Sequence, residues 1–290
     1  MSEPHVRKLG ETLGAELVGV DLSEPITSER AVLLQRAFTE NPVLVVRGQK
    51  LTPEQLIAIG SVFGRLEAHS ILQYRHPEHA ELSYITNVDK DGNIDTFGAE
   101  KRAVDWHSDG SFKARPDSVA FLYSVTAPSK GGPTEFVNMY AAYETLPETT
   151  RRRLDGMKAF HKRGEGWAST SPPPPLTEAQ KATGEFEGTE HPLVIRHPDS
   201  GRKAIYVNPG HTVGVVGMDK AASDALLDQL IEHATQPKFY YAHQWKVGDL
   251  LFWDQRCLMH RAGRGTPAGE KRIMIRGMMI NELTAERLAA

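Results

Sequence analysis

Cysteine is almost absent from this sequence, since Cys257 is the only one in 290 residues. A disulfide within the chain and a cluster of thiolate metal ligands are therefore excluded, and a reducing compartment is favoured. Long apolar runs are missing too, because no stretch approaches the ~18 uninterrupted apolar residues of a membrane span. The first residues also lack the apolar segment of a signal peptide. We expect a soluble, cytoplasmic protein that does not bind membranes.

An excess of charge of either sign is also missing. The 34 basic and 37 acidic residues give a formal net charge of −3, which provides no field to attract nucleic acid. The remaining composition, with 40% hydrophobic and 24% charged residues, is typical of a globular protein that buries a substantial core. We expect a single domain that spans residues 1–290.

Short apolar or alternating runs predict many strands. They lie at residues 15–22, 43–46, 84–88, 119–125, 134–137, 193–195, 204–207, 239–245, 250–253 and 272–280. Helix signals are fewer: Thr27 or Ser28, Thr52 and Asp219 are predicted caps, and the helix that Thr52 opens should reach about Phe63. Such a pattern predicts a mainly β fold, a sandwich or barrel with flanking helices.

Residues 164–190 differ in composition from the rest of the chain. Four consecutive prolines, 172–175, stand between glycines and acidic residues, and such a run cannot form a helix or a central strand. A loop of this length inside a compact domain is usually a lid or a disordered insertion. We therefore expect a lid or mobile insertion at 164–190.

An imidazole and a carboxylate separated by one residue stand at His107 and Asp109. If this segment is extended, both side chains point to one face and could bind one metal ion. His260 is a third candidate ligand, because it stands between an aromatic strand and a glycine-broken loop, where it could project into the mouth of a barrel. Two histidines and one carboxylate are typical of non-haem iron(II) oxygenases, but hydrolytic zinc sites use them too. The ligand types leave both possibilities open.

Two arginines, Arg272 and Arg276, accompany the last predicted strand. Positions i and i+4 of a strand face the same side, so both guanidinium groups should point into one compartment. An arginine on an inward strand face is costly unless an anion meets it. We therefore expect two anions near the metal. The alternative is an exposed strand face on which both arginines pair with acidic residues.

Six segments resemble, in the same order, the iron(II)- and 2-oxoglutarate-dependent dioxygenases typified by taurine dioxygenase and 2,4-dichlorophenoxyacetate dioxygenase. They are WHSDGSF at 106–112, GGPT at 131–134, AYETLP at 142–147, SGRK at 200–203, WDQRCLMHR at 253–261 and RIMIR at 272–276. Each segment is weak evidence alone, but all six in order are strong evidence. The resemblance implies a double-stranded β-helix (jelly-roll) core with a metal ion in its mouth.

The resemblance also implies roles for the residues at the matching positions. His107, Asp109 and His260 would bind Fe(II). Arg272 and Thr134 would bind the distal carboxylate of 2-oxoglutarate, because a guanidinium group recognises a carboxylate through two directed hydrogen bonds. The implied reaction consumes O2 and 2-oxoglutarate, releases succinate and CO2, and hydroxylates a substrate carbon.

The primary substrate is implied less closely. Arg276, His69 and the backbone near Gly110 stand where relatives bind the anionic group of the substrate. Leu72 and His211 replace aromatic residues of the taurine pocket, so the resemblance does not favour taurine. His211 is more similar to the aryloxyalkanoate branch and could line the pocket or hydrogen-bond the lid.

We therefore expect a small anionic organic substrate, an aryloxyalkanoate-like carboxylate that is hydroxylated and then cleaved at the resulting hemiacetal. A sulfonate or sulfate ester is the alternative. Two interpretations from other classes are a zinc hydrolase on the same ligands and a non-catalytic jelly-roll binding protein. Arg272 and Thr134, beside an intact ligand set, argue against the binding protein. The resemblance also predicts a homo-oligomer.

Overall fold

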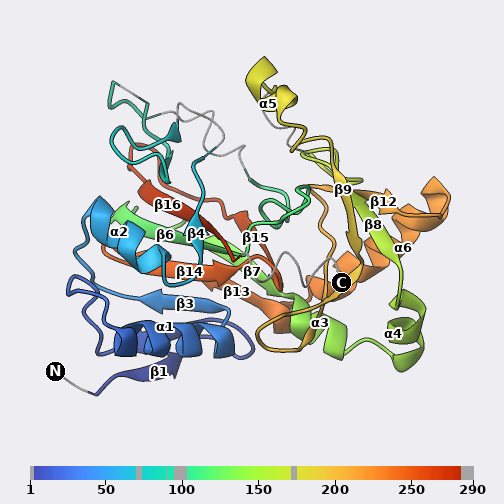
Figure 1. Cartoon of the computed structure of the whole chain (residues 1–290), viewed down its shortest axis with the longest axis horizontal. Helices are drawn as coiled ribbons and strands as arrows, with labels where there is room; N and C mark the ends of the chain where they lie inside the picture. Colours follow the sequence, from blue (N-terminus) through green and yellow to red (C-terminus); the bar gives the residue numbers. More distant parts are fainter. Residues whose placement is uncertain (1–2, 70–73, 90, 95–102, 171–174, 282–290) are drawn as a thin grey trace.

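A large, mostly antiparallel sheet dominates the computed structural model, which describes residues 3–69, 74–89, 91–94, 103–170 and 175–281 (Figure 1). Its strand order is β1-β2-β3-β14-β6-β16-β4, with β5 also paired to β16, and only the β2–β3 pair is parallel. The strands are β1 His5–Lys8, β2 Ala15–Val18, β3 Val43–Val46, β4 Arg65–Leu66, β5 Leu82–Thr86, β6 Val119–Thr126, β14 Leu250–Asp254 and β16 Ile273–Ile280. The expectation of a mainly β protein is confirmed.

The central strands of this sheet are apolar on both faces because each face contacts a separate core. Phe121 and Phe252 belong to a cluster that includes side chains of α1 (Ser28–Glu40) and α2 (Pro53–Gly60). Leu251 and Trp253, which alternate with Phe252 along β14, belong to a second cluster on the opposite face. The sheet therefore lies between a helical layer and the interior of the jelly roll.

The two covering helices begin at the predicted caps. The Thr27 side chain accepts a hydrogen bond from the amide of Arg30 at the start of α1. Thr52 and Gln55 form a capping box at the start of α2. The prediction that α2 reaches Phe63 is wrong, since the helix ends at Gly60. Phe63 instead turns into the core, with its ring centroid 4.9 Å from that of Phe252.

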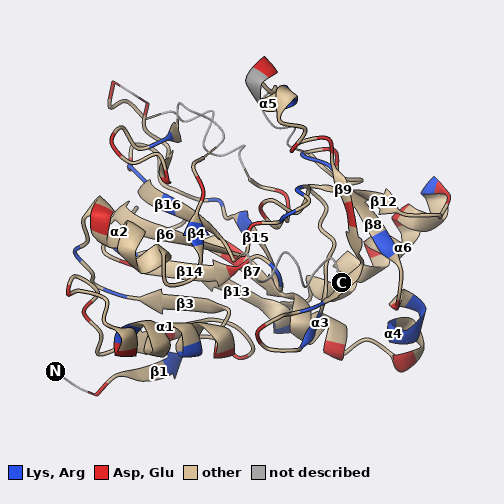
Figure 2. Ribbon diagram, viewed as in Figure 1, with Lys and Arg blue, Asp and Glu red and all other residues tan. Residues whose placement is uncertain are grey.

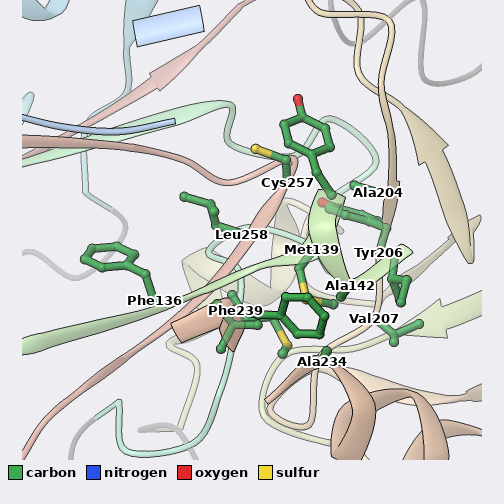
Figure 3. Close-up of a cluster of buried hydrophobic side chains, with 14 of the residues drawn as sticks. Phe136, Met139, Ala142, Ala204, Tyr206, Val207, Ala234, Phe239, Cys257 and Leu258 are labelled. Carbon is green, nitrogen blue, oxygen red and sulfur yellow. The ribbon is translucent and has the colours of Figure 1, made fainter. Parts of the chain in front are cut away.

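A second, three-stranded sheet shares the inner core with the large one. Its order is β13-β7-β15, with β13 Tyr240–His243, β7 Thr134–Asn138 and β15 Leu258–Ala262. The shared cluster combines side chains of β14 and β6 with those of β7, β15 and α3 (Met139–Glu144). Figure 3 shows the part of this cluster in which Phe136, Met139 and Leu258 gather with Tyr206. Packing in this shared core thus holds the second sheet in place. Its edge strand β15 contains His260.

The remaining elements lie beside these sheets, and most of them contribute side chains to the same inner core (Figure 1). They are the sheet β12-β8-β9, with β8 Lys158–His161, β9 Thr189–Pro192 and β12 Thr212–Val215, the pair β10 Val194–Arg196 and β11 Lys203–Ile205, and the helices α4 Glu148–Leu154, α5 Glu178–Ala182, α6 Lys220–Ala234 and η3 Pro237–Phe239. Asp219 caps α6 as predicted. None of the helices in the described part of the chain is long and apolar enough to cross a membrane.

Acidic and basic residues are interspersed over most of the fold (Figure 2). The clearest basic concentration is on α4, which carries Arg151, Arg152 and Arg153 in its last turn. The predicted lid at 164–190 contains α5 and the start of β9, while residues 171–174 lie outside the described residues. Its role as a lid stays a prediction.

Candidate metal centre

His107 and His260 are joined by an antiparallel bridge. The amide of His107 donates to the carbonyl of His260 at 3.0 Å, and the amide of His260 donates to the carbonyl of His107 at 2.8 Å. His260 is the middle residue of β15, so the expectation that it stands between a strand and a loop is wrong. The strand continues past it because β15 pairs with β7 as far as Ala262.

Asp109 converges on the two histidines from a turn. Within residues 107–110, His107 alone pairs with a strand. Asp109 lies in the turn that includes Gly110. Gly110 has φ +69°, and a Cβ there would stand 2.3 Å from Oδ2 of Asp117, so this turn requires glycine. The turn, rather than the extended spacing expected from the sequence, directs the carboxylate towards His107.

The three ligand atoms lie within 4.8 Å of one another. Oδ1 of Asp109 is 3.8 Å from Nε2 of His107, and Oδ2 is 3.6 Å from Nε2 of His260. Nδ1 of His107 lies 2.7 Å from the carbonyl oxygen of Asp105. Because a carbonyl only accepts, this Nδ1 carries the proton and Nε2 is free to bind a metal. Two imidazoles and one carboxylate fit the donor chemistry of an iron(II) or zinc ion.

Gln255 holds the carboxylate of Asp109, although no sequence motif indicated this role. It is fully buried. Its Oε1 accepts the amide of Asp109 at 3.0 Å, and its Nε2 donates to Oδ2 of the same residue at 3.3 Å. A carboxylate oriented in this way loses less freedom when a metal binds.

The electrostatics of the cluster favour an ionised Asp109 carboxylate beside a neutral His260 imidazole. Burial would raise the pKa of Asp109, but His260, Arg276 and His107 outweigh it and hold that pKa well below its usual range. Burial lowers the pKa of His260 to about 3, and the neighbouring His107 adds to this effect. These are the protonation states that metal binding requires.

Thr134 and Arg272 meet at the side chain of Trp245. The indole N–H donates to Oγ1 of Thr134 at 3.1 Å, and the guanidinium carbon of Arg272 lies 5.8 Å from the ring centroid. Thr134 is two residues from Phe136, the register partner of His260, so it points to the same side of the sheet as that ligand. Burial alone lowers the pKa of Arg272 to about 10. A partly buried cation and a hydroxyl that share one neighbour form the arrangement that a carboxylate ligand needs.

Arg276 reaches the metal cluster from β16. Its Nη1 is 3.7 Å from Oδ2 of Asp109, and its side chain is only 16% exposed. Its Nε is buried without a hydrogen-bond partner among the described residues. The alternative of an exposed strand face paired with acids is therefore wrong, and the inward orientation is correct for both Arg272 and Arg276.

His211 lies against one of the candidate ligands. Its ring centroid is 6.1 Å from that of His107 and 5.2 Å from that of Phe112. Its Nδ1 accepts a hydrogen bond from the amide of Gly164 at 3.1 Å. His211 therefore both borders the cluster and holds the first residue of the segment predicted to be a lid.

The structure says less about the other two candidate substrate residues. The ring of His69 packs edge-on against Tyr74, and its carbonyl accepts a hydrogen bond from Arg75. Its role as a substrate ligand stays a prediction. Leu72 lies outside the described residues.

A second group, His197, Asp254 and Cys257, also has its potential ligand atoms within 4.8 Å. The Arg256 guanidinium donates two hydrogen bonds, of 2.9 and 2.6 Å, to the Asp254 carboxylate. Nε2 of His197 lies 3.0 Å from the same carboxylate. Nδ1 of His197 accepts two backbone amides, so Nε2 must carry the proton and donate. An adjacent permanent cation and a protonated imidazole nitrogen make this a structural ion pair rather than a metal site.

Comparisons with known proteins agree with this geometry. The model of the taurine catabolism dioxygenase TauD, TfdA family matches residues 5–279. The chain belongs to this family. The 2,4-dichlorophenoxyacetate dioxygenase of Cupriavidus pinatubonensis, which is alpha-ketoglutarate-dependent, is 37% identical over 84% of this chain and 87% of its own length. The alpha-ketoglutarate-dependent sulfate ester dioxygenase of Pseudomonas putida is 32% identical over 90% and 84%.

A solved structure supports the same assignment. The crystal structure of AAD-2 in complex with Mn(II) and N-oxalylglycine superposes with a TM-score of 0.82, at 29% identity over 97% of this chain and 98% of that one. The protein is therefore a jelly-roll oxidoreductase of the 2-oxoglutarate-dependent dioxygenase type. The expected cofactors, Fe(II), 2-oxoglutarate and O2, are confirmed by family membership. The zinc hydrolase and the non-catalytic binding protein are set aside.

Proposed function

We propose that His107, Asp109 and His260 bind the iron(II) ion of this dioxygenase. The convergence of their donor atoms and the ionised state of Asp109 support this assignment. When bound, iron supplies the activation of O2 that drives the oxidative decarboxylation of 2-oxoglutarate and the hydroxylation of a substrate carbon. Two histidines and one carboxylate would hold the iron and would leave open positions on it for other ligands.

Arg272 and Thr134 would bind the distal carboxylate of 2-oxoglutarate. The support for this role is a partly buried guanidinium group and a hydroxyl that share one neighbour, Trp245. Nε of Arg272 also donates to the carbonyl of Gly132 at 3.3 Å, which fixes the plane of the group. A carboxylate bound there would offset the cost of burying this charge.

The substrate would be an aryloxyalkanoate-like carboxylate, held by Arg276. The observation that carries this proposal is the position of the Arg276 guanidinium at the metal cluster, where it would place the carbon next to the substrate carboxylate near the iron. His211, the backbone near Gly110 and His69 would complete the anion site. One oxygen atom enters the C–H bond and the other enters succinate. The hydroxylated carbon then carries two oxygens, and its C–O bond breaks to release a phenol and an aldehyde.

A sulfate ester is the second candidate substrate. The relative from Pseudomonas putida is named for this activity, and a guanidinium group can bind a sulfate through the same paired hydrogen bonds as a carboxylate. Hydroxylation of the carbon that bears the sulfate would release sulfate and an aldehyde. The proposed residues would therefore serve either substrate.

A succinate-release screen tests the proposal. The protein loaded with Fe(II) should release succinate from 2-oxoglutarate with phenoxyacetates, and the amount of phenol should match the succinate. Alkyl sulfates, alkyl sulfonates and taurine form the parallel arms, and stoichiometric sulfate release would favour the second candidate. His107→Ala should abolish all turnover; if it leaves the rate unchanged, the proposed metal site is wrong.

A further inference from the structure

Next to the proposed iron ligands, on the opposite side of their strands, lies a second set of contacts. Trp106 precedes His107 and Arg261 follows His260, so their side chains point away from the metal. The guanidinium carbon of Arg261 stands 4.3 Å from the ring centroid of Trp106, within the range of a cation–π contact. This side-chain contact adds to the backbone bridge and to the hydrogen bonds Ser108–Leu258 and Ala262–Ala103 that join the two His-bearing segments.

Glu135 completes the set from the neighbouring strand. It is the register partner of Arg261 across β7 and β15, and its Oε2 is 2.5 Å from Nε of Arg261. The Glu135 side chain is 14% exposed and that of Arg261 is 38% exposed, so this pair is screened less than a typical surface pair. The ring of Tyr240 meets Trp106 edge-on at 6.3 Å and limits its movement.

We infer that Trp106, Glu135 and Arg261 are positioning residues that hold His107 and His260 at the separation an iron ion requires. Glu135 fixes the guanidinium plane of Arg261, and that plane holds Trp106 and therefore the backbone of His107. Besides the two hydrogen bonds of the bridge, Oγ of Ser108 donates to the carbonyl of Leu258 at 2.8 Å and the amide of Ala262 donates to the carbonyl of Ala103 at 2.8 Å. Without the outer contacts, these hydrogen bonds alone would hold the His107 segment on β15, and we expect the distance between the two Nε2 atoms to vary more. The inference rests on the proposed ligand set.

The chain contains a matched control. Arg202 lies 4.3 Å from the ring centroid of Tyr140 and pairs with Glu144 at 2.8 and 2.9 Å. This is the same combination of arginine, aromatic ring and glutamate, with a similar exposure of the arginine, 43%. Its described contacts include none of the three proposed ligands. Arg202→Ala therefore removes the same kinds of interaction without touching the metal site.

The experiment measures Co(II) binding and amide hydrogen exchange. Arg261→Ala should raise the Kd for Co(II) by about tenfold or more, the usual effect of losing an outer contact of a metal ligand, and should shift the visible Co(II) absorption bands. In the metal-free protein it should also reduce the protection of the His107 and His260 amides. Arg202→Ala breaks a more exposed pair, so it should lower the melting temperature no more than Arg261→Ala does and should leave the Kd within about twofold, a difference that marks a positioning role.

Two conservative variants keep the test decisive if Arg261→Ala fails to fold. Glu135→Gln and Arg261→Lys should weaken Co(II) binding in the same direction, whereas Trp106→Tyr, which retains an aromatic face, should restore most of it relative to Trp106→Leu. Equal Kd values in the Arg261, Glu135 and Arg202 variants would overturn the inference. The proposed ligand set fails separately, if His107→Ala still binds Co(II) as the wild type does.

Discussion

The amide of Gly164 donates a hydrogen bond to Nδ1 of His211 at 3.1 Å. Because Nδ1 accepts, the proton of the neutral ring lies on Nε2. Burial, with the neighbouring His107, lowers the pKa of His211 to about 4, so the ring is neutral at pH 7. His211 therefore offers an uncharged N–H donor beside the metal cluster.

Replacing this donor tests the substrate site. His211→Phe retains the ring shape and removes the N–H. Because a hydrogen bond to a charged group contributes about 1.5–3 kcal/mol, the KM for the primary substrate should rise by at least about tenfold. The KM for 2-oxoglutarate should stay within about twofold in steady-state assays. A change confined to the KM for 2-oxoglutarate would contradict the assignment of His211 to the primary-substrate site.

Arg276, in the last strand, and Arg272, just before it, should have separate effects. Arg272→Leu should raise the KM for 2-oxoglutarate by roughly 10- to 100-fold through the loss of a charge-assisted contact. Arg276→Leu should act mainly on the primary substrate. Arg264→Leu, an exposed arginine in the preceding loop, is the control and should alter neither constant. The reverse pattern would exchange the two roles.

The buried pair of Arg256 and Asp254 should contribute strongly to the free energy of unfolding. Both side chains are 4% exposed, so Arg256→Met would leave a buried carboxylate without its cation. We expect a loss of about 3–5 kcal/mol in the free energy of unfolding, measured by urea titration. Arg152→Met breaks an exposed pair with Glu148 and should cost less than about 1 kcal/mol. Equal effects of the two variants would contradict this account.

Acid should destabilise the metal-free protein through His161. Burial, and then the neighbouring His191 and His211, hold the pKa of His161 well below its ordinary value of 6.5, and its Nε2 has no hydrogen-bond partner among the described residues. The unfolded chain therefore binds a proton near pH 6.5 that the folded chain does not. The resulting stability is full above that pH and falls as the pH decreases.

The free energy of unfolding should decrease with falling pH at a defined slope. One such group reduces the free energy of unfolding by about 1.4 kcal/mol for each pH unit well below pH 6.5. His161→Gln should lower the slope between pH 6 and pH 5 by close to one proton, measured by urea titration at each pH. His5→Gln, at an exposed position, should leave the slope unchanged. An identical slope in wild type and His161→Gln would show that another group takes up the proton.

Local chemistry explains the parts of the fold that the sequence predicts well. The run Val43–Val46 became β3 without a shift at either end, and Thr52 with Gln55 forms a capping box from atoms within one turn. The strands β8 and β12 were not predicted. Their short, mixed sequences pair across about fifty residues, as His161 does with Thr212, and no local pattern carries that information.

The residues of the candidate site also divide into those that the local sequence predicts and those that it does not. His107, Asp109 and His260 could be found because two histidines and one carboxylate match the ligand types of a known metal site, although the extended spacing and the strand-end setting expected for them were wrong. Gln255 and Trp245 could not, because each acts through the register that brings it to a residue more than 100 positions away. In the sequence, Gln255 and Trp245 could equally be ordinary core residues with no role at the site. Only the folded structure distinguishes the two cases.

The three donor atoms of the cluster lie within 4.8 Å of one another, and a backbone bridge and Gln255 orient the residues that carry them. Such a donor set selects a charge and a ligand type but not one element. Copper, nickel, cobalt and zinc bind nitrogen and oxygen donors more tightly than iron(II) does. The metal content of a preparation should therefore reflect the buffer and the growth medium, and chelation followed by anaerobic addition of iron(II) should recover the activity that a competing metal suppresses.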